Sequence, residues 1–245
     1  MKKQFNTYRF PVSGGYWKDA LKELHNIRSL VICAILCAVA IVMEKFQIPI
    51  IPGILTVSFS FTVISLCSFI TGPVLAIPCG IIVDIVGAMI FPTGYPFHPG
   101  YTLSAVLSAL IYALFLYRAK LSFERLALAK LVINVFVNVL LGSVWRLAGG
   151  NFYLYYVALS GIKNLLMFPF EVFIMTVFIR ALLPSLCRLG LCDPSLKLEV
   201  SKKKILICAL AVVLCMAVLI LYLTNEAAVK AAIEGFLNKM LAIVK

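Results

Sequence analysis

Residues that could bind a negatively charged aromatic molecule gather near the junction of two apolar runs. Trp145 and Arg146 end one run, and Lys163 and Asn164 open the next. Planar rings can stack on an aromatic ligand, while cations and amides can pair with its carboxylates. Tyr and Trp also occur as a simple interfacial belt in membrane proteins, and this accounts for some of the nearby rings. A belt does not explain the two cations.

Four polar side chains stand inside apolar runs, namely Asp84, Asn134, Asn138 and Glu171. A charge at the centre of a bilayer costs about 2.5 to 3.5 kcal/mol, so such groups usually face the interior of a bundle and find a partner. For Asp84 and Glu171, internal hydrogen bonding is as well supported as ligand contact, and we assign them as structural. Asn134 and Asn138 share one helical face. Asn138 lies nearer the expected outer end and is the better ligand candidate.

The stretch FPTGYPFHPGYT, Phe91 to Thr102, is stiff and aromatic, and it separates two apolar runs. Its prolines and glycines predict an ordered loop. Such a loop could cover a pocket and offer four rings to a ligand: Tyr95, Phe97, His98 and Tyr101. The alternative is a rigid turn that carries belt aromatics.

The elements that position these groups are membrane helices. Hydrophobic residues make up 63% of the 245 residues, charged residues 13%, and the mean hydropathy is +1.06, values far outside the range of soluble domains. A helical span needs about 20 apolar residues. We expect an all-α integral membrane bundle of six helices with a seventh, C-terminal transmembrane helix, over residues 29–46, 53–71, 73–91, 101–118, 127–146, 158–183 and 204–223.

The distribution of basic residues predicts the orientation of the spans. With the N-terminus inside, 16 of the 22 Lys and Arg residues are cytoplasmic, including Arg118, Lys120, Arg125 and Lys130 around the start of the fifth span. The positive-inside rule favours this arrangement. We therefore expect a multi-pass protein of the cell membrane with a cytoplasmic N-terminus. The net charge of +12 is a signal of topology, and no nucleic-acid partner is expected.

Motifs for chemistry are missing from the chain. There is no GxxxxGK[ST], HExxH or GxSxG, and only two histidines occur. Six of the eight cysteines lie in apolar runs, where cysteine behaves as a small hydrophobic residue: Cys33, Cys37, Cys67, Cys79, Cys208 and Cys215. We expect no catalytic residue, no metal and no cofactor. A membrane enzyme would need its acids to converge, and only Asp84 and Glu171 could do so.

Three linked motifs resemble the substrate-binding S-components of energy-coupling factor (ECF) vitamin transporters, specifically the folate family. They are a G-x-x-x-D-x-x-G third helix with Gly80, Asp84 and Gly87, an outer loop of the PTG-x-x-x-PG type that has four residues between PTG and PG here, over 92–100, and a TLSA fourth helix that continues to Tyr112. The resemblance extends from about residue 25 to 190. KNLLMFPFE, Lys163 to Glu171, is similar to the sixth helix of the family.

The resemblance implies a vitamin bound near the outer surface and carried inward by a complex. Ala34 and Ala38 match the A-x-x-x-A element that docks on the transmembrane coupling subunit, and two ATP-binding-cassette ATPases complete the importer. We expect a folate-like ligand, with Arg146, Lys163 and His98 on its carboxylates or polar edges and Trp145, Tyr95 and Phe97 for stacking. Where the family often has an Arg near position 160, this chain has Ser160, and Arg146 could substitute for it.

The resemblance and the apolar runs together predict how the chain is divided, and the C-terminal part departs from the pattern of the family. Residues 1–28 form a cytoplasmic segment with an amphipathic helix over Trp17 to Arg28, residues 29–190 the six-helix core, and residues 191–245 a basic linker, an extra transmembrane helix and an amphipathic tail in contact with lipid. Two alternatives to a folate S-component stay open: a structural or accessory membrane subunit, and an S-component for another anionic heterocyclic vitamin.

Overall fold

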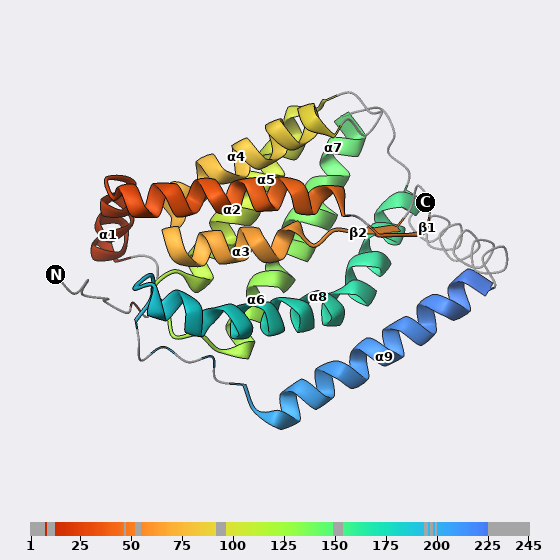
Figure 1. The fold of residues 1–245 in the computed structure, drawn as a ribbon. Helices are drawn as coiled ribbons and strands as arrows, with labels where there is room; N and C mark the ends of the chain where they lie inside the picture. The colour runs from red at the N-terminus through yellow and green to blue at the C-terminus, as the bar shows by residue number, and fades with distance from the viewer. Residues whose placement is uncertain are drawn as a thin grey trace.

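The computed structural model is a helical bundle with one short pair of strands (Figure 1). It describes residue 8 and residues 13–46, 48–51, 55–91, 97–148, 154–193, 196, 198 and 200–224. Five helical segments are long and apolar enough to cross a membrane: Ile27–Lys45, Pro73–Ile90, Pro99–Leu116, Phe123–Trp145 and Ser160–Arg188. The shorter apolar helix Ser60–Thr71 is the sixth helix of the core. The prediction of a six-helix membrane bundle is confirmed, and the chain is a multi-pass membrane protein.

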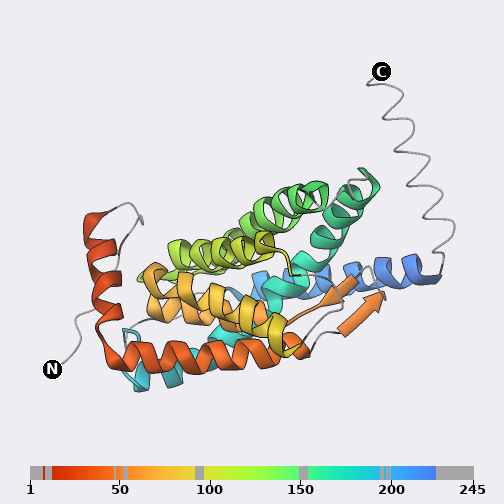
Figure 2. The same cartoon turned by 90° about the horizontal axis from the view of Figure 1, so that it is seen from above.

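The N-terminal helices meet at a sharp corner. Helix α1, Gly14–Leu24, ends beside Asn26, whose side chain accepts a hydrogen bond from the Arg28 amide and so caps α2, Ile27–Lys45. Figure 2 shows α1 turned away from the long axis of α2. The predicted amphipathic helix over Trp17 to Arg28 is therefore displaced toward the N-terminus and ends before the corner.

A two-stranded antiparallel sheet follows α2. Strand β1, Ile48–Ile51, pairs with β2, Leu55–Val57, and α3 begins only at Ser60 and ends at Thr71. The predicted span over 53–71 is wrong in its first part. Two prolines, at 49 and 52, oppose a helix there, and the β-branched residues suit strands. At the start of α3 the Ser58 hydroxyl accepts from the amide of Ser60.

Helices α4, Pro73–Ile90, and α5, Pro99–Leu116, lie side by side and make a close seam of small residues. Ala76, Ala109 and Ala113 are fully buried there. A Cβ atom on Gly80 would lie 3.1 Å from the backbone oxygen of Ala105. Small residues allow such backbone contact between membrane helices, which explains the first glycine of the third-helix motif.

The second half of the bundle contains an unusual helix. Helix α6, Phe123–Val132, continues into the π-helix η1, Ile133–Leu141, and then into α7, Gly142–Ala148. Helix α8, Leu154–Arg188, contains Pro169 and Pro184 and bends in Figure 1, as prolines within a helix commonly cause. Helix α9, Lys202–Thr224, packs against α8. A helix thus forms over the predicted seventh span, while its membrane crossing stays a prediction.

The main core lies where α3, α5, α6 and α8 meet. Its buried residues include Phe69, Tyr112, Leu126 and Met175. A second apolar cluster joins α2, α3 and α4 and is rich in cysteine. These two clusters hold the helices around the space between α5, η1 and α8.

Arg118 anchors α1 to the end of α5. Its guanidinium lies 3.2 Å from the Asp19 carboxylate and 3.3 Å from Glu23, and all three side chains are at most 10% exposed. Tyr16 adds a hydrogen bond of 2.9 Å to the Ala113 carbonyl. Burial by itself raises the pKa of Asp19, but hydrogen bonds from Tyr8 and Lys22 and the charge of Arg118 lower it overall. Helix α1 is thus tied to the bundle by ion pairs as well as by apolar contact.

We predict that Arg118→Ala releases α1. The variant removes the buried cation that both carboxylates share, and breaking a buried ion pair typically costs about 3 to 5 kcal/mol. Amide hydrogen exchange of Gly14–Leu24 should accelerate strongly. Lys22→Ala is the matched control, because Lys22 pairs with the same Asp19 but is 78% exposed, and such pairs contribute about 0 to 1 kcal/mol. Equal protection of α1 in Arg118→Ala and the native chain would contradict the anchor.

Candidate ligand-binding site

A buried ion pair joins α6 to α8. The Lys130 ammonium lies 3.1 Å from one oxygen of Glu171, and the other oxygen accepts a hydrogen bond of 2.9 Å from the Asn134 side chain. Lys130 is 3% exposed and lies 4.1 Å above the centre of the Phe61 ring. The expectation that Lys130 contributes to a cytoplasmic surface charge does not fit its burial and its ion pair with Glu171. A positive residue near the start of a span was counted toward topology, whereas it turns inward to neutralise Glu171.

A row of amides extends from this ion pair. The Asn138 side chain donates to Asn134 and to Asn164, both at 3.1 Å, and Asn164 donates to the Ser160 carbonyl at 2.8 Å. Asn134 and Asn138 belong to the π-helix η1. Helices of this kind occur often at functional sites. The predicted ligand residues Asn138 and Asn164 are therefore in direct contact.

An aromatic group lies at the start of α5. The His98 ring is 5.9 Å from both the Tyr101 ring and the Trp145 ring. The Trp145 indole donates to the Ser104 hydroxyl at 2.9 Å, and the imidazole Nδ1 of His98 accepts from the Gly100 amide. A Cβ on Gly100 would lie only 2.4 Å from the Trp145 ring, so glycine is required for this packing.

A cavity of about 380 Å³ connects the amide row to the aromatic group. Of the predicted ligand residues, Tyr101, Asn138, Lys163 and Asn164 line it. Phe97 is 58% exposed and does not line the cavity. His98 and Trp145 do not line it either, but each contacts a residue that does: the His98 ring packs against Tyr101, and the Trp145 indole donates to Ser104. Tyr95 lies outside the described residues, as does the side chain of Arg146, whose backbone is part of α7.

Other lining residues were not anticipated from the sequence. They include Lys130 and a stripe of α5 in which Tyr101 is followed by Ser104, Ser108 and Tyr112. Residues three or four positions apart lie on one face of a helix. A polar face on an otherwise apolar helix is the sequence signal that could have predicted these lining residues. Tyr112 is 1% exposed, and its hydroxyl has no hydrogen-bond partner among the described residues. Buried polar groups normally have one.

Of the remaining predicted residues, Glu171 lines the cavity, while Asp84, Ala34 and Ala38 do not. Asp84 accepts a hydrogen bond of 2.6 Å from the Thr102 hydroxyl, which ties α4 to α5. Asp84 and Glu171 thus have different partners, and neither supplies the paired acids that an enzyme would need. Ala34 and Ala38 are exposed on α2, while their neighbours Cys33 and Cys37 are buried.

The lining combines one carboxylate with two cations, Lys130 and Lys163. The formal charges of Lys130, Lys163 and Glu171 sum to +1 in the described lining. The cavity can therefore accept an anionic molecule with planar, hydrogen-bonding edges. Its volume falls within the range of about 300 to 1,000 Å³ that is usual for small-molecule sites.

No model of a known protein family matches the chain. A folate transporter FolT from Clostridium novyi (strain NT) is 31% identical over 153 residues, which cover 62% of this chain and 88% of the relative. A folate transporter FolT from Leuconostoc mesenteroides subsp. mesenteroides is 32% identical over 154 residues, or 60% of this chain and 82% of the relative.

A solved structure gives the same relationship. The crystal structure of FolT bound with folic acid is 31% identical, has a TM-score of 0.54, and matches 60% of this chain and 88% of that one. The relatives are transporters, in agreement with the prediction that this chain is not an enzyme. Since a relative of this identity is matched over most of its length, the chain belongs to the folate family of ECF S-components.

Proposed function

We propose that this chain binds folate in the cavity between α5, η1 and α8 and delivers it inward as part of an ATP-driven ECF importer. The observation that carries the proposal is the cavity of about 380 Å³ with excess positive charge, in a chain whose relatives include a FolT bound with folic acid. Folate combines a flat pterin, a benzoyl ring and two carboxylates. The rings and amides suit its planar parts, and Lys163 suits a carboxylate.

The charge distribution supports an outer position for this cavity. Ser58 and Tyr101 line it at the starts of α3 and α5, the end of the bundle that carries the strand pair. Helix α1 and Arg118 lie at the opposite end (Figure 1). Lys18, Lys22 and Arg28 accumulate there, and the positive-inside rule assigns such an end to the cytoplasm. In this orientation the chain lies in the cell membrane with its N-terminus on the cytoplasmic side.

Energy coupling would come from partners, a transmembrane coupling subunit and two ATP-binding-cassette ATPases. Ala34 and Ala38 support this part of the proposal, because both face outward from α2 at a spacing of four residues. Small residues at this spacing allow another helix to approach closely. Their outward orientation favours docking over packing within the bundle.

Titration of folate into the purified full chain in detergent tests the binding. We expect one folate per chain and no heat from thiamine or riboflavin. Lys163→Ala should weaken folate binding about 10- to 100-fold, because a hydrogen bond to a charged group contributes about 1.5 to 3 kcal/mol. Lys120→Ala is the control, since Lys120 is exposed and lies outside the cavity. A folded sample that binds no folate would contradict the proposal and point to another ligand.

Tyr112→Phe separates ligand contact from stability. If the Tyr112 hydroxyl donates to folate, the variant should bind folate about 2- to 10-fold more weakly while the ligand-free protein is equally or more stable, because an unsatisfied buried group is removed. Tyr16→Phe is the reciprocal control. Its hydroxyl already bonds the Ala113 carbonyl, so that variant should lose stability and keep its folate affinity. Unchanged affinity in Tyr112→Phe would exclude the contact.

The docking role of α2 can be tested independently of ligand binding. Large side chains in Ala34→Trp/Ala38→Trp should block close approach and reduce co-purification with the coupling subunit at least about tenfold, with folate binding preserved. The control is Ala88→Trp, which adds one such large side chain at an exposed position of α4. Equal recovery of the complex from both variants would remove α2 as the docking face.

A further inference from the structure

Four cysteines that are far apart in the sequence meet inside the bundle. Cys33 and Cys37 come from α2, Cys67 from α3 and Cys79 from α4. All are buried, at 7%, 4%, 1% and 1% exposure, within one apolar cluster. The sequence analysis treated them as separate small hydrophobic residues, because no C-x-x-C spacing links them. Their convergence depends on the packing of three helices.

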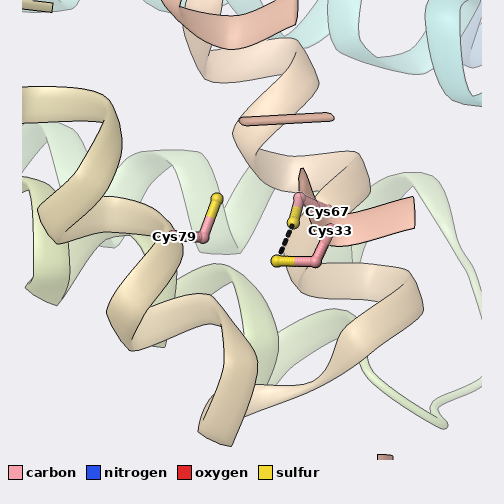
Figure 3. Close-up of side chains that lie close together, drawn as sticks. All are labelled: Cys33, Cys67 and Cys79. Atoms are coloured by element: carbon pink, nitrogen blue, oxygen red, sulfur yellow. Dashed lines mark hydrogen bonds between the residues drawn. The ribbon is translucent and has the colours of Figure 1, made fainter. Parts of the chain in front are cut away.

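The sulfur atoms form a compact group. Those of Cys33, Cys67 and Cys79 all lie within 4.8 Å of one another, and Figure 3 shows the three side chains close together, with Cys33 and Cys67 joined by a hydrogen bond. The Cys33 and Cys67 sulfurs are 3.7 Å apart, and those of Cys37 and Cys79 are 2.9 Å apart. Thiolate sulfurs bound tetrahedrally to zinc at about 2.3 Å are about 3.8 Å apart. The 3.7 Å between the Cys33 and Cys67 sulfurs is close to this value, and the Cys37 and Cys79 sulfurs would have to move apart to bind one ion.

We propose that Cys33, Cys67 and Cys79 bind one thiophilic metal ion of the zinc type, with Cys37 as the fourth ligand. Soft thiolate ligands select ions such as Zn²⁺ over Mg²⁺ or Ca²⁺. Each ligating thiol gives up its proton, and a divalent ion offsets half of the negative charge of four thiolates, which would be costlier still without the ion in this apolar surrounding. Binding therefore releases protons and weakens as the pH falls.

The site would be structural. Apart from Ile41, the buried residues of α2 are small: Ser29, Cys33, Cys37 and Ala40. Ile41 and the partly buried Leu36 and Met43 supply the large apolar contacts of α2 in this cluster, and a shared metal ion would add a strong link to α3 and α4. Because the ligands are buried, the ion is acquired before the three helices close together.

Metal analysis of the full chain tests this site. The protein is produced in zinc-supplied medium and purified in detergent without chelator, and we expect about one zinc per chain. A cobalt-loaded sample should show the sulfur-to-cobalt charge-transfer absorption of a thiolate site. Cys67→Ser/Cys79→Ser should contain less than about a tenth of the metal. Cys208→Ser is the matched control, because Cys208 is a buried cysteine of α9 outside the group. This variant should keep the metal of the native chain.

Circular dichroism and size-exclusion chromatography report whether each variant is folded, and a double variant that does not fold is replaced by Cys33→Ala, with the same expected loss of metal. Three results would overturn the proposal. They are a native chain that contains no zinc or cobalt after loading, a folded ligand variant that retains full metal, and mass spectrometry that finds a Cys37–Cys79 disulfide. None of these depends on the affinity of the chain for folate.

Discussion

The ion pair between Lys130 and Glu171 is the constraint on which the rest of the site depends. A lone carboxylate inside a membrane bundle is costly, and it is tolerated here because the ammonium of Lys130 and the amide of Asn134 satisfy both of its oxygens. This pairing fixes α6 and η1 in register with α8. Asn138 then meets Asn164, and Lys163 is directed to the same cavity. One electrostatic requirement therefore positions polar groups from two helices.

The helices could be predicted from the sequence because bilayer thickness sets a length that apolar runs must reach. The bounds of α4 and α8 follow from this rule and from the prolines and charges beside them. The strand pair before α3 was missed because an apolar run of isoleucine, leucine and valine satisfies a hydropathy rule in either conformation. Only the prolines at 49 and 52 opposed the helix, and they were treated as boundaries.

The site was predictable where residues close in the sequence share a helical face, as with Asn134 and Asn138. It was not predictable where a contact joins distant helices. Lys130 was assigned from its position near a span end, and nothing local shows that it turns toward Glu171, 41 residues later. The meeting of Cys37 with Cys79 has the same cause, since it depends on how α2 packs against α4.

The seam between α4 and α5 limits how the protein can rearrange. Gly80 brings the two backbones into van der Waals contact, and the Asp84–Thr102 hydrogen bond adds a polar link near one end. Interfaces packed this closely do not slide gradually. We therefore expect α4 and α5 to move together as one rigid body. A route by which a molecule enters or leaves the cavity sideways must then open along η1, whose contacts with α8 include exchangeable side-chain amide bonds.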